Sequence, residues 1–300
     1  MTHNHHHNNE IAEKNLLLVT ILNFSIAIAE IIGGLISNSL SLLSDALHNS
    51  GDAFAVLLAY IANKVSKKSP TYSKTYGFKR IEILAALFNA IVLIAISVFL
   101  FYEAYKRLIN PEPIKGAIML IVALIGLFAN ILAVILLHKS SEANINIKAA
   151  YLHLIGDTVS SVAVIIGGIL IYFFKIYWVD PVITIILGLY IIKHTYSILK
   201  QVVNILMQGT PYNLNLNEIK KEVEKLPEIS NIHHVHAWNL NDREIHFECH
   251  IDLKENISLK ETNKIRLELE QLLTSKFNIN HITIQFEYNI CENKDMIIGK

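Results

Sequence analysis

Long apolar stretches separated by short polar links fill the first two thirds of the chain. Each is long enough, at about 1.5 Å rise per residue, to cross about 30 Å of hydrocarbon as a helix. The stretches cover residues 16–36, 39–62, 81–102, 116–138, 149–174 and 179–199. We therefore predict a membrane all-α domain, a six-helix transmembrane bundle, over residues 16–207.

After Pro211 the apolar positions follow shorter periods. Helical spacing over 215–226 and 258–273 alternates with strand-like patterns over 229–240, 245–252 and 282–288. Ser258 and Glu261 form a capping box at the start of the second helix. The order helix, strand, strand, helix, strand predicts an α+β domain over residues 208–300, with both helices on one face of a small open sheet.

Composition agrees with a membrane protein. The 300 residues are 52% hydrophobic and only 17% charged, and the formal net charge is zero. Such a chain is too apolar for one ordinary soluble domain, and it has no basic footprint for a nucleic acid. Cys249 and Cys291 form no CxxC pair and cannot build a disulfide framework, which fits a soluble part on the reducing cytosolic side.

Basic residues in the links predict the orientation of the chain. The link between the second and third stretches is strongly basic, whereas the link between the first and second has no Lys or Arg. Positively charged links tend to stay in the cytoplasm, so both termini are expected there. The basic residues of the second link are Lys64, Lys67, Lys68, Lys74, Lys79 and Arg80.

Two copies of an HxxxD pattern lie inside apolar stretches. His48 and Asp52 belong to the second stretch, and His153 and Asp157 belong to the fifth. Residues four apart lie on one face of a helix, so each pair presents an imidazole beside a carboxylate. Two His nitrogens and two Asp oxygens suit a tetrahedral divalent ion such as zinc. The alternative is a buried hydrogen-bonded cluster, or a proton relay without metal.

Two further groups are candidate accessory ligands. Asp45 lies three residues before His48 and near the same helix face. Residues 1–15 form a His-rich cytoplasmic tail that could collect metal, although an expression tag would look similar. The histidines of this tail are His3, His5, His6 and His7.

Polar residues also gather on the strands predicted for the terminal domain. His250 and Glu287 occupy the polar positions of two strands, and His233 and His234 lie close together on another. Converging side chains of these types can bind a metal ion. A solvated strand face explains the same pattern, because alternation alone places polar residues there.

Several motifs resemble the cation diffusion facilitator family, and most closely its zinc-transporting, cobalt-zinc-cadmium efflux branch. They are SNSLSLLSDALHNSGD, YGFKRIEILAALFNA, AAYLHLIGDTVSSV, VDP and HVHAW. The resemblance implies a homodimer of six-span protomers with a cytoplasmic ferredoxin-like domain, exporting divalent metal in exchange for protons. It gives the transport-site roles to His48, Asp52, His153 and Asp157. In the terminal domain it gives regulatory metal-ligand roles to His233, His250 and Glu287, with His234 a close alternative.

The expected function is therefore a divalent cation efflux transporter in the lipid bilayer of a bacterial inner membrane. Zn²⁺ is the expected substrate, Cd²⁺ and Co²⁺ are further candidates, and protons are the expected counter-ion. An intramembrane zinc metalloenzyme is the first alternative, but the chain has no HExxH motif, and four protein ligands favour binding over catalysis. A membrane metal sensor is the second alternative, and it would leave the intramembrane ligands unexplained.

Overall fold

A computed structural model describes residues 3–141, 145–290 and 295–297, and it describes side chains over 18–138, 151–290 and 295–297. Contacts divide the chain into two compact units. The first comprises residues 1–60 and 88–198, and the second comprises residues 61–87 and 199–300. The link between the second and third long helices therefore belongs to the same unit as the terminal domain.

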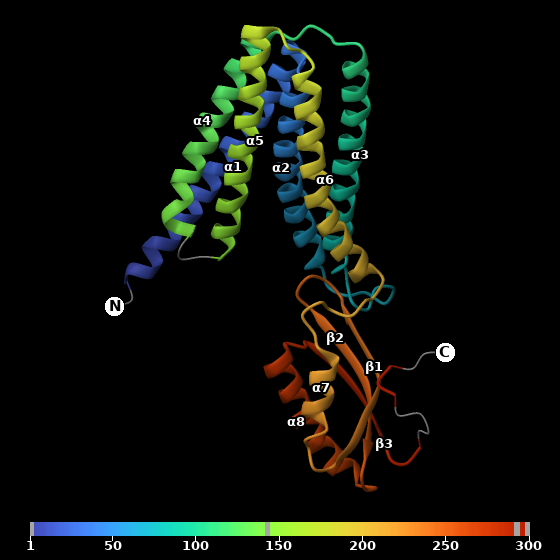
Figure 1. The fold of residues 1–300 in the computed structure, drawn as a ribbon. Coiled ribbons are helices and arrows are strands. Elements are labelled where there is room, and N and C mark those ends of the chain that lie inside the picture. Colours follow the sequence, from blue (N-terminus) through green and yellow to red (C-terminus); the bar gives the residue numbers. More distant parts are fainter. Residues whose placement is uncertain (1–2, 142–144, 291–294, 298–300) are drawn as a thin grey trace. The chain divides into compact units, whose positions relative to one another are not determined.

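Six long helices occur in the apolar part of the chain (Figure 1). The helix α4 packs against both α5 and α1. Large apolar side chains such as Phe99, Phe128 and Phe173 remain exposed on the helices, as expected for surfaces that face lipid. The bounds are α1 His3–Ser37, α2 Leu40–Ser66, α3 Ile81–Ile109, α4 Gly116–Ser141, α5 Ile145–Phe174 and α6 Val179–Leu206.

Among the described residues, five of these helices contain a segment that is long and apolar enough to cross a membrane. The segments are Leu18–Ser37, Ile81–Ile109, Gly116–His138, Tyr151–Phe174 and Val179–Leu206. The helix α2 has the necessary length but not the apolarity, because Asp45, His48 and Asp52 and several serines interrupt it. The protein is thus a multi-pass membrane protein, and five of the six expected spans meet the apolarity criterion.

A buried carboxylate fixes the start of α2. Asp180, in the first turn of α6, accepts hydrogen bonds from the backbone N–H of Leu40 at 2.7 Å and of Ser41 at 3.1 Å. It also accepts from the hydroxyls of Ser39 and Ser41, both at 2.6 Å. The first N–H groups of a helix have no partner within the helix, so Asp180 caps α2 from a neighbouring helix.

The terminal part has the predicted order of elements. It consists of α7 Leu216–Val223, β1 Ile229–Asn239, β2 Ile245–Leu253, α8 Leu259–Phe277 and β3 His281–Glu287. The sheet order is β1-β2-β3, with β1 antiparallel and β3 parallel to β2. Figure 1 shows α7 and α8 on one face of this sheet. The predicted capping box is present, since Ser258 and Glu261 exchange hydrogen bonds with each other's backbone N–H.

The other face of the sheet is more buried than strict alternation predicts. His246 and Asp252 lie on the polar side of β2, yet they are as buried as its apolar residues. A bulge between His233 and His236 places two residues of β1 opposite one of β2. His234 takes a positive φ of 50° there, which redirects the strand locally.

Candidate metal centres

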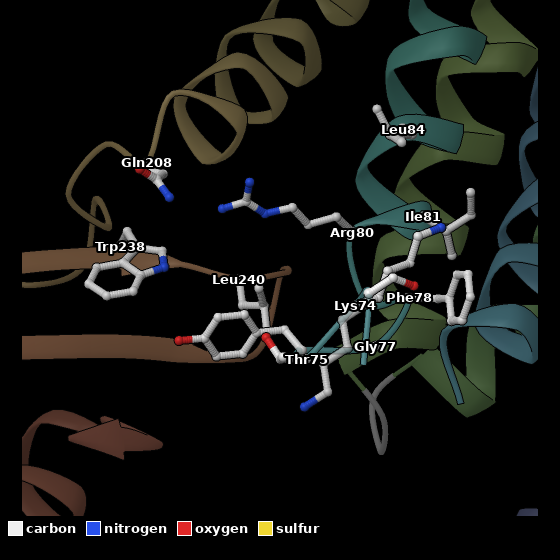
Figure 2. Close-up of a pocket in the computed structure, with 13 residues that line it drawn as sticks. Lys74, Thr75, Gly77, Phe78, Arg80, Ile81, Leu84, Gln208, Trp238 and Leu240 are labelled. Atoms are coloured by element: carbon white, nitrogen blue, oxygen red, sulfur yellow. The ribbon is translucent and has the colours of Figure 1, made fainter. Parts of the chain in front are cut away.

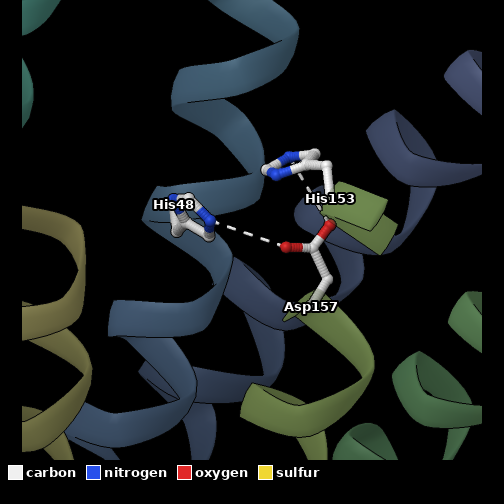
Figure 3. A group of neighbouring side chains, drawn as sticks. All are labelled: His48, His153 and Asp157. Carbon is white, nitrogen blue, oxygen red and sulfur yellow. Dashed lines mark ion pairs between the residues drawn. The ribbon is translucent and has the colours of Figure 1, made fainter. Parts of the chain in front are cut away.

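The helices α2 and α5 bring both HxxxD pairs together. The Nε2 atom of His48 lies 3.5 Å from Oδ1 of Asp157 and 3.7 Å from Oδ2 of Asp52. The Nε2 atom of His153 lies 2.8 Å from Oδ2 of Asp52 and 3.6 Å from Oδ2 of Asp157. Figure 3 shows His48 and His153 on either side of the Asp157 carboxylate. Each imidazole therefore contacts a carboxylate of its own helix and one of the other helix.

Burial within this intramembrane cluster is uneven. The side chains of His48 and Asp157 are 7% and 2% exposed, whereas those of His153 and Asp52 are 34% and 37% exposed. One half of the cluster, His48 and Asp157, is thus enclosed, and the other half, His153 and Asp52, is more open. Among the described residues, neither ring nitrogen of His48 has a hydrogen-bond partner. Buried polar atoms normally have one, so a bound cation would satisfy this residue.

Asp45 is buried beside the cluster but is bound by hydroxyls. Its carboxylate accepts hydrogen bonds from Ser160 at 2.6 Å and from Ser161 at 3.3 Å. Asn130 of α4 donates in turn to the hydroxyl of Ser161 at 3.1 Å. Asp45 and His48 also line one small cavity. These contacts give Asp45 a place in a polar network that links α2, α4 and α5. The ligand atoms that lie within 4.8 Å of one another come from His48, His153 and Asp157, so both Asp45 and Asp52 lie outside this tightest group.

A second buried polar pair lies one residue from His48. Asn49 donates a hydrogen bond at 3.0 Å to Glu30 of α1, and both side chains are buried. Polar residues inside membrane helices usually form hydrogen bonds to neighbouring helices, and Asn49 and Asn130 both do so here. The helix that carries His48 and Asp52 is thus held by polar contacts to α1 as well as α5.

The terminal domain contains a second group of converging ligands. Glu287 lies between two histidines, with Oε2 at 3.3 Å from Nε2 of His233 and Oε1 at 2.8 Å from Nδ1 of His250. The side chains of His233, His250 and Glu287 are 0%, 17% and 6% exposed. A solvated strand face is therefore the wrong description of these residues. Neither ring nitrogen of His233 has a hydrogen-bond partner among the described residues.

His234 lies next to this terminal cluster and not inside it. Its ring centroid is 4.5 Å from that of His250, while its backbone N–H bonds to the carbonyl of Asp295. The group of converging ligand atoms comprises His233, His250 and Glu287, and His234 is not part of it. His3, His5, His6 and His7 lie outside the residues whose side chains are described.

The helices and the intramembrane cluster define a multi-pass membrane protein that carries histidine and aspartate ligands within its apolar part. The family model described as the cation efflux transmembrane domain matches residues 16–207, and the one described as the cation efflux protein cytoplasmic domain matches residues 211–289. The chain belongs to the cation efflux family, which confirms the resemblance found in its motifs. It is therefore a cation efflux transporter.

Relatives resemble the chain over almost its whole length. A zinc transporter ZitB of Pectobacterium atrosepticum is 37% identical over 98% of this chain and 91% of its own length. A cadmium, cobalt and zinc/H⁺-K⁺ antiporter of Bacillus subtilis is 38% identical over 96% of this chain and 92% of its own. The metal cation efflux system protein CzcD of Cupriavidus metallidurans is 35% identical over 94% of this chain and 89% of its own length.

Proposed function

We propose that this protein exports Zn²⁺ from the cytoplasm in exchange for protons, by alternating access. The observation that carries the proposal is the convergence of His48, Asp52, His153 and Asp157 from α2 and α5. These four side chains hold the transported ion. Ionisable groups within a membrane domain commonly mark an ion pathway, and these four lie within the part of the chain that matches the cation efflux transmembrane domain.

Zinc is the favoured substrate because two imidazoles and two carboxylates complete a tetrahedral site. Relatives are named for zinc, cadmium and cobalt, so Cd²⁺ and Co²⁺ are the next candidates. The metal is the cargo here, and it must be released as well as bound. The open half of the cluster, at Asp52 and His153, provides a route for both steps.

Proton coupling follows from competition for the same atoms. A neutral imidazole binds a metal ion and a protonated imidazole repels it. Protons that bind His48 and His153 after metal release neutralise nearby Asp52 and Asp157, so the metal-free cluster carries less uncompensated charge. Alternating access then requires that the metal-bound and protonated forms change conformation more readily than the empty, negatively charged form.

The wider architecture that we propose has six spans, with α2 as the span that is not strongly apolar. Residues 1–15 form the His-rich tail, residues 16–207 the transmembrane domain and residues 208–300 a ferredoxin-like domain. Both termini are cytoplasmic, the protein is a homodimer, and its membrane is the bacterial inner membrane. The dimer is supported by the match of the terminal domain to the cation efflux cytoplasmic domain.

The terminal cluster of His233, His250 and Glu287 is proposed as a regulatory metal site. Metal there would regulate transport only if it bound one arrangement of the domains better than another. The burial of Glu287 between two imidazoles supports a site that binds a cation rather than a surface that water covers.

Everted membrane vesicles test the transport proposal. With an imposed proton gradient, vesicles that contain the protein should accumulate radioactive zinc against its concentration gradient, and collapse of the proton gradient should stop this accumulation. A metalloenzyme or a membrane sensor would not concentrate zinc. Vesicles that bind zinc without concentrating it would contradict the proposal.

A further inference from the structure

A pocket of about 500 Å³ lies within the unit formed by residues 61–87 and 199–300. Its lining comes from the YGFKR motif and the start of α3 on one side, and from Gln208, Trp238 and Leu240 on the other (Figure 2). The intramembrane cluster lies in the other unit, so metal transport leaves this pocket unexplained.

The pocket lining is basic. It includes Lys74, Lys79 and Arg80 and contains no Asp or Glu. Lys79 is paired with Glu244 at 2.7 Å, and the Nζ atom of Lys74 lies 4.4 Å from the ring centroid of Phe78.

Arg80, like Lys74, has no carboxylate partner among the described residues, whereas Lys79 has one. Its guanidinium makes no ion pair with any described residue, and its Nε is buried without a hydrogen-bond partner there. Figure 2 shows the Arg80 side chain extended toward Gln208. A guanidinium whose donors lack partners is suited to a phosphate, which accepts two parallel hydrogen bonds from it.

The charged side chains beside the pocket also act on the pKa of His246. Burial lowers the pKa of His246, and the imidazole of His281 lowers it further. Lys79 and Arg80 also lower this pKa, and Glu244 opposes them.

Apolar groups complete the lining. Leu84 lies in α3, one of the segments that could cross a membrane, and Trp238 and Leu240 lie in the opposite wall. Tryptophan is enriched where an apolar phase meets water. Basic residues near a membrane surface attract anionic lipids. The link between α2 and α3 is basic throughout, and residues 61–80 contain no acidic side chain.

We propose that this pocket binds the phosphate of an anionic phospholipid headgroup, with Arg80 as its principal ligand. The apolar wall formed by Leu84, Trp238 and Leu240 receives the adjoining part of the lipid. A soluble phosphate offers the same anionic group to Arg80 but would leave this wall unused, which favours the lipid.

Tryptophan fluorescence of the full chain tests the proposal. The chain has two tryptophans, so Trp178→Phe leaves Trp238 as the only reporter, at the pocket itself. The detergent-solubilised protein is titrated with dihexanoyl phosphatidylglycerol, dihexanoyl phosphatidylcholine or inorganic phosphate. We expect a saturable change with phosphatidylglycerol, and affinities at least about tenfold weaker for the other two.

Three variants distinguish specific lipid binding in the pocket from general electrostatic attraction of the lipid to a basic segment. Arg80→Gln should weaken phosphatidylglycerol binding about tenfold, since it removes a charged hydrogen-bonding fork. The matched control is Lys67→Gln, which removes the same charge from a residue outside the pocket and should change the affinity less than about twofold. Arg80→Lys keeps the charge without the fork and should also bind more weakly.

Equal losses in Arg80→Gln and Lys67→Gln would overturn the proposal, because they would show non-specific electrostatic attraction. Inorganic phosphate that binds as tightly as phosphatidylglycerol would overturn the lipid assignment. If Arg80→Gln does not fold, Arg80→Lys decides the question, and an affinity equal to that of the parent protein would count against the site.

Discussion

The Asp180 cap predicts a large loss of stability when its carboxylate is removed. Asp180 is fully buried and accepts four hydrogen bonds at the start of α2. Asp180→Ala leaves the N–H groups of Leu40 and Ser41 and two serine hydroxyls without this partner. Hydrogen bonds to a charged group contribute about 1.5–3 kcal/mol each, but they are not additive within one cluster. We therefore expect a net loss of about 3–5 kcal/mol, as for other buried polar groups that lose a charged partner.

Such a loss corresponds to a decrease in melting temperature on the order of 10 °C for a protein of this size. The assay is thermal unfolding of the purified protein in detergent, followed by intrinsic fluorescence. The melting temperature of Asp180→Asn should lie between those of Asp180→Ala and the parent. An amide keeps one acceptor oxygen, but it also presents a donor to groups that are themselves donors.

Glu112→Gln is the matched control for the Asp180 variants. Glu112 is an exposed carboxylate that accepts a hydrogen bond from Asn38, just before the same helix. Glu112 also lies 3.7 Å from the guanidinium of Arg107. Ion pairs of exposed carboxylates contribute little, so the melting temperature of Glu112→Gln should stay close to that of the parent. An Asp180→Ala protein that melts within about 2 °C of the parent would refute the assignment of Asp180 as the cap of α2.

Three further outcomes are expected. His48→Asp should lower the ratio of zinc to cadmium uptake in vesicles, since carboxylate oxygens depend less on imidazole geometry; an unchanged ratio would contradict this role. A fragment that begins at residue 208 contains its own apolar core. Calorimetry should show that this fragment binds zinc more tightly than its His233→Ala/His250→Ala double variant does, and equal affinities would contradict the terminal metal site. The pKa of His246 is lower in the folded chain than in the unfolded chain, so the unfolded chain binds a proton more readily. The contribution of His246 to stability is therefore lost as the pH falls below about 6.5, the ordinary imidazole pKa, and through the lower pKa of the folded chain. Melting of His246→Gln should depend less on pH than that of the parent between about pH 7.5 and 5.5, and an equal dependence would count against the shift.

The long helices and the two HxxxD pairs could be predicted from the residues because both leave a strong signal in the sequence. Apolar runs of about 20 residues and HxxxD spacing follow from helix geometry, so the amino-acid order alone places the two HxxxD pairs on two separate helices, α2 and α5. The terminal elements follow from alternation and from the Ser258 capping box. Over the described residues, the helix α2 is the one expected span that is not strongly apolar, because its polar residues lower the mean hydropathy by which spans are recognised.

Contacts between distant parts of the chain could not be predicted in this way. Asp180 belongs to a VDP motif, yet its role in capping α2 depends on a fold that places α6 beside Ser39. The burial of His233 depends on a bulge, and a single extra residue in a strand has no periodic signal. The polar residues of β2 have the sequence of a solvated face, but His246 and Asp252 are covered.

The most direct measurement of the central claim is zinc uptake by proteoliposomes that contain Asp157→Ala, with folding verified by thermal unfolding. Asp157 is the most enclosed ligand of the intramembrane cluster, and its two oxygens lie 3.5 and 3.6 Å from two different imidazoles. Ser161→Ala is the control, because it removes a polar group four residues further along α5 that contacts Asp45 and Asn130 and none of the four residues proposed to hold the transported ion. Under a proton gradient, we expect zinc uptake by Asp157→Ala to fall to background, at least about 100-fold below that of the parent. Ser161→Ala should still take up zinc. Full zinc uptake by a folded Asp157→Ala protein would contradict the account.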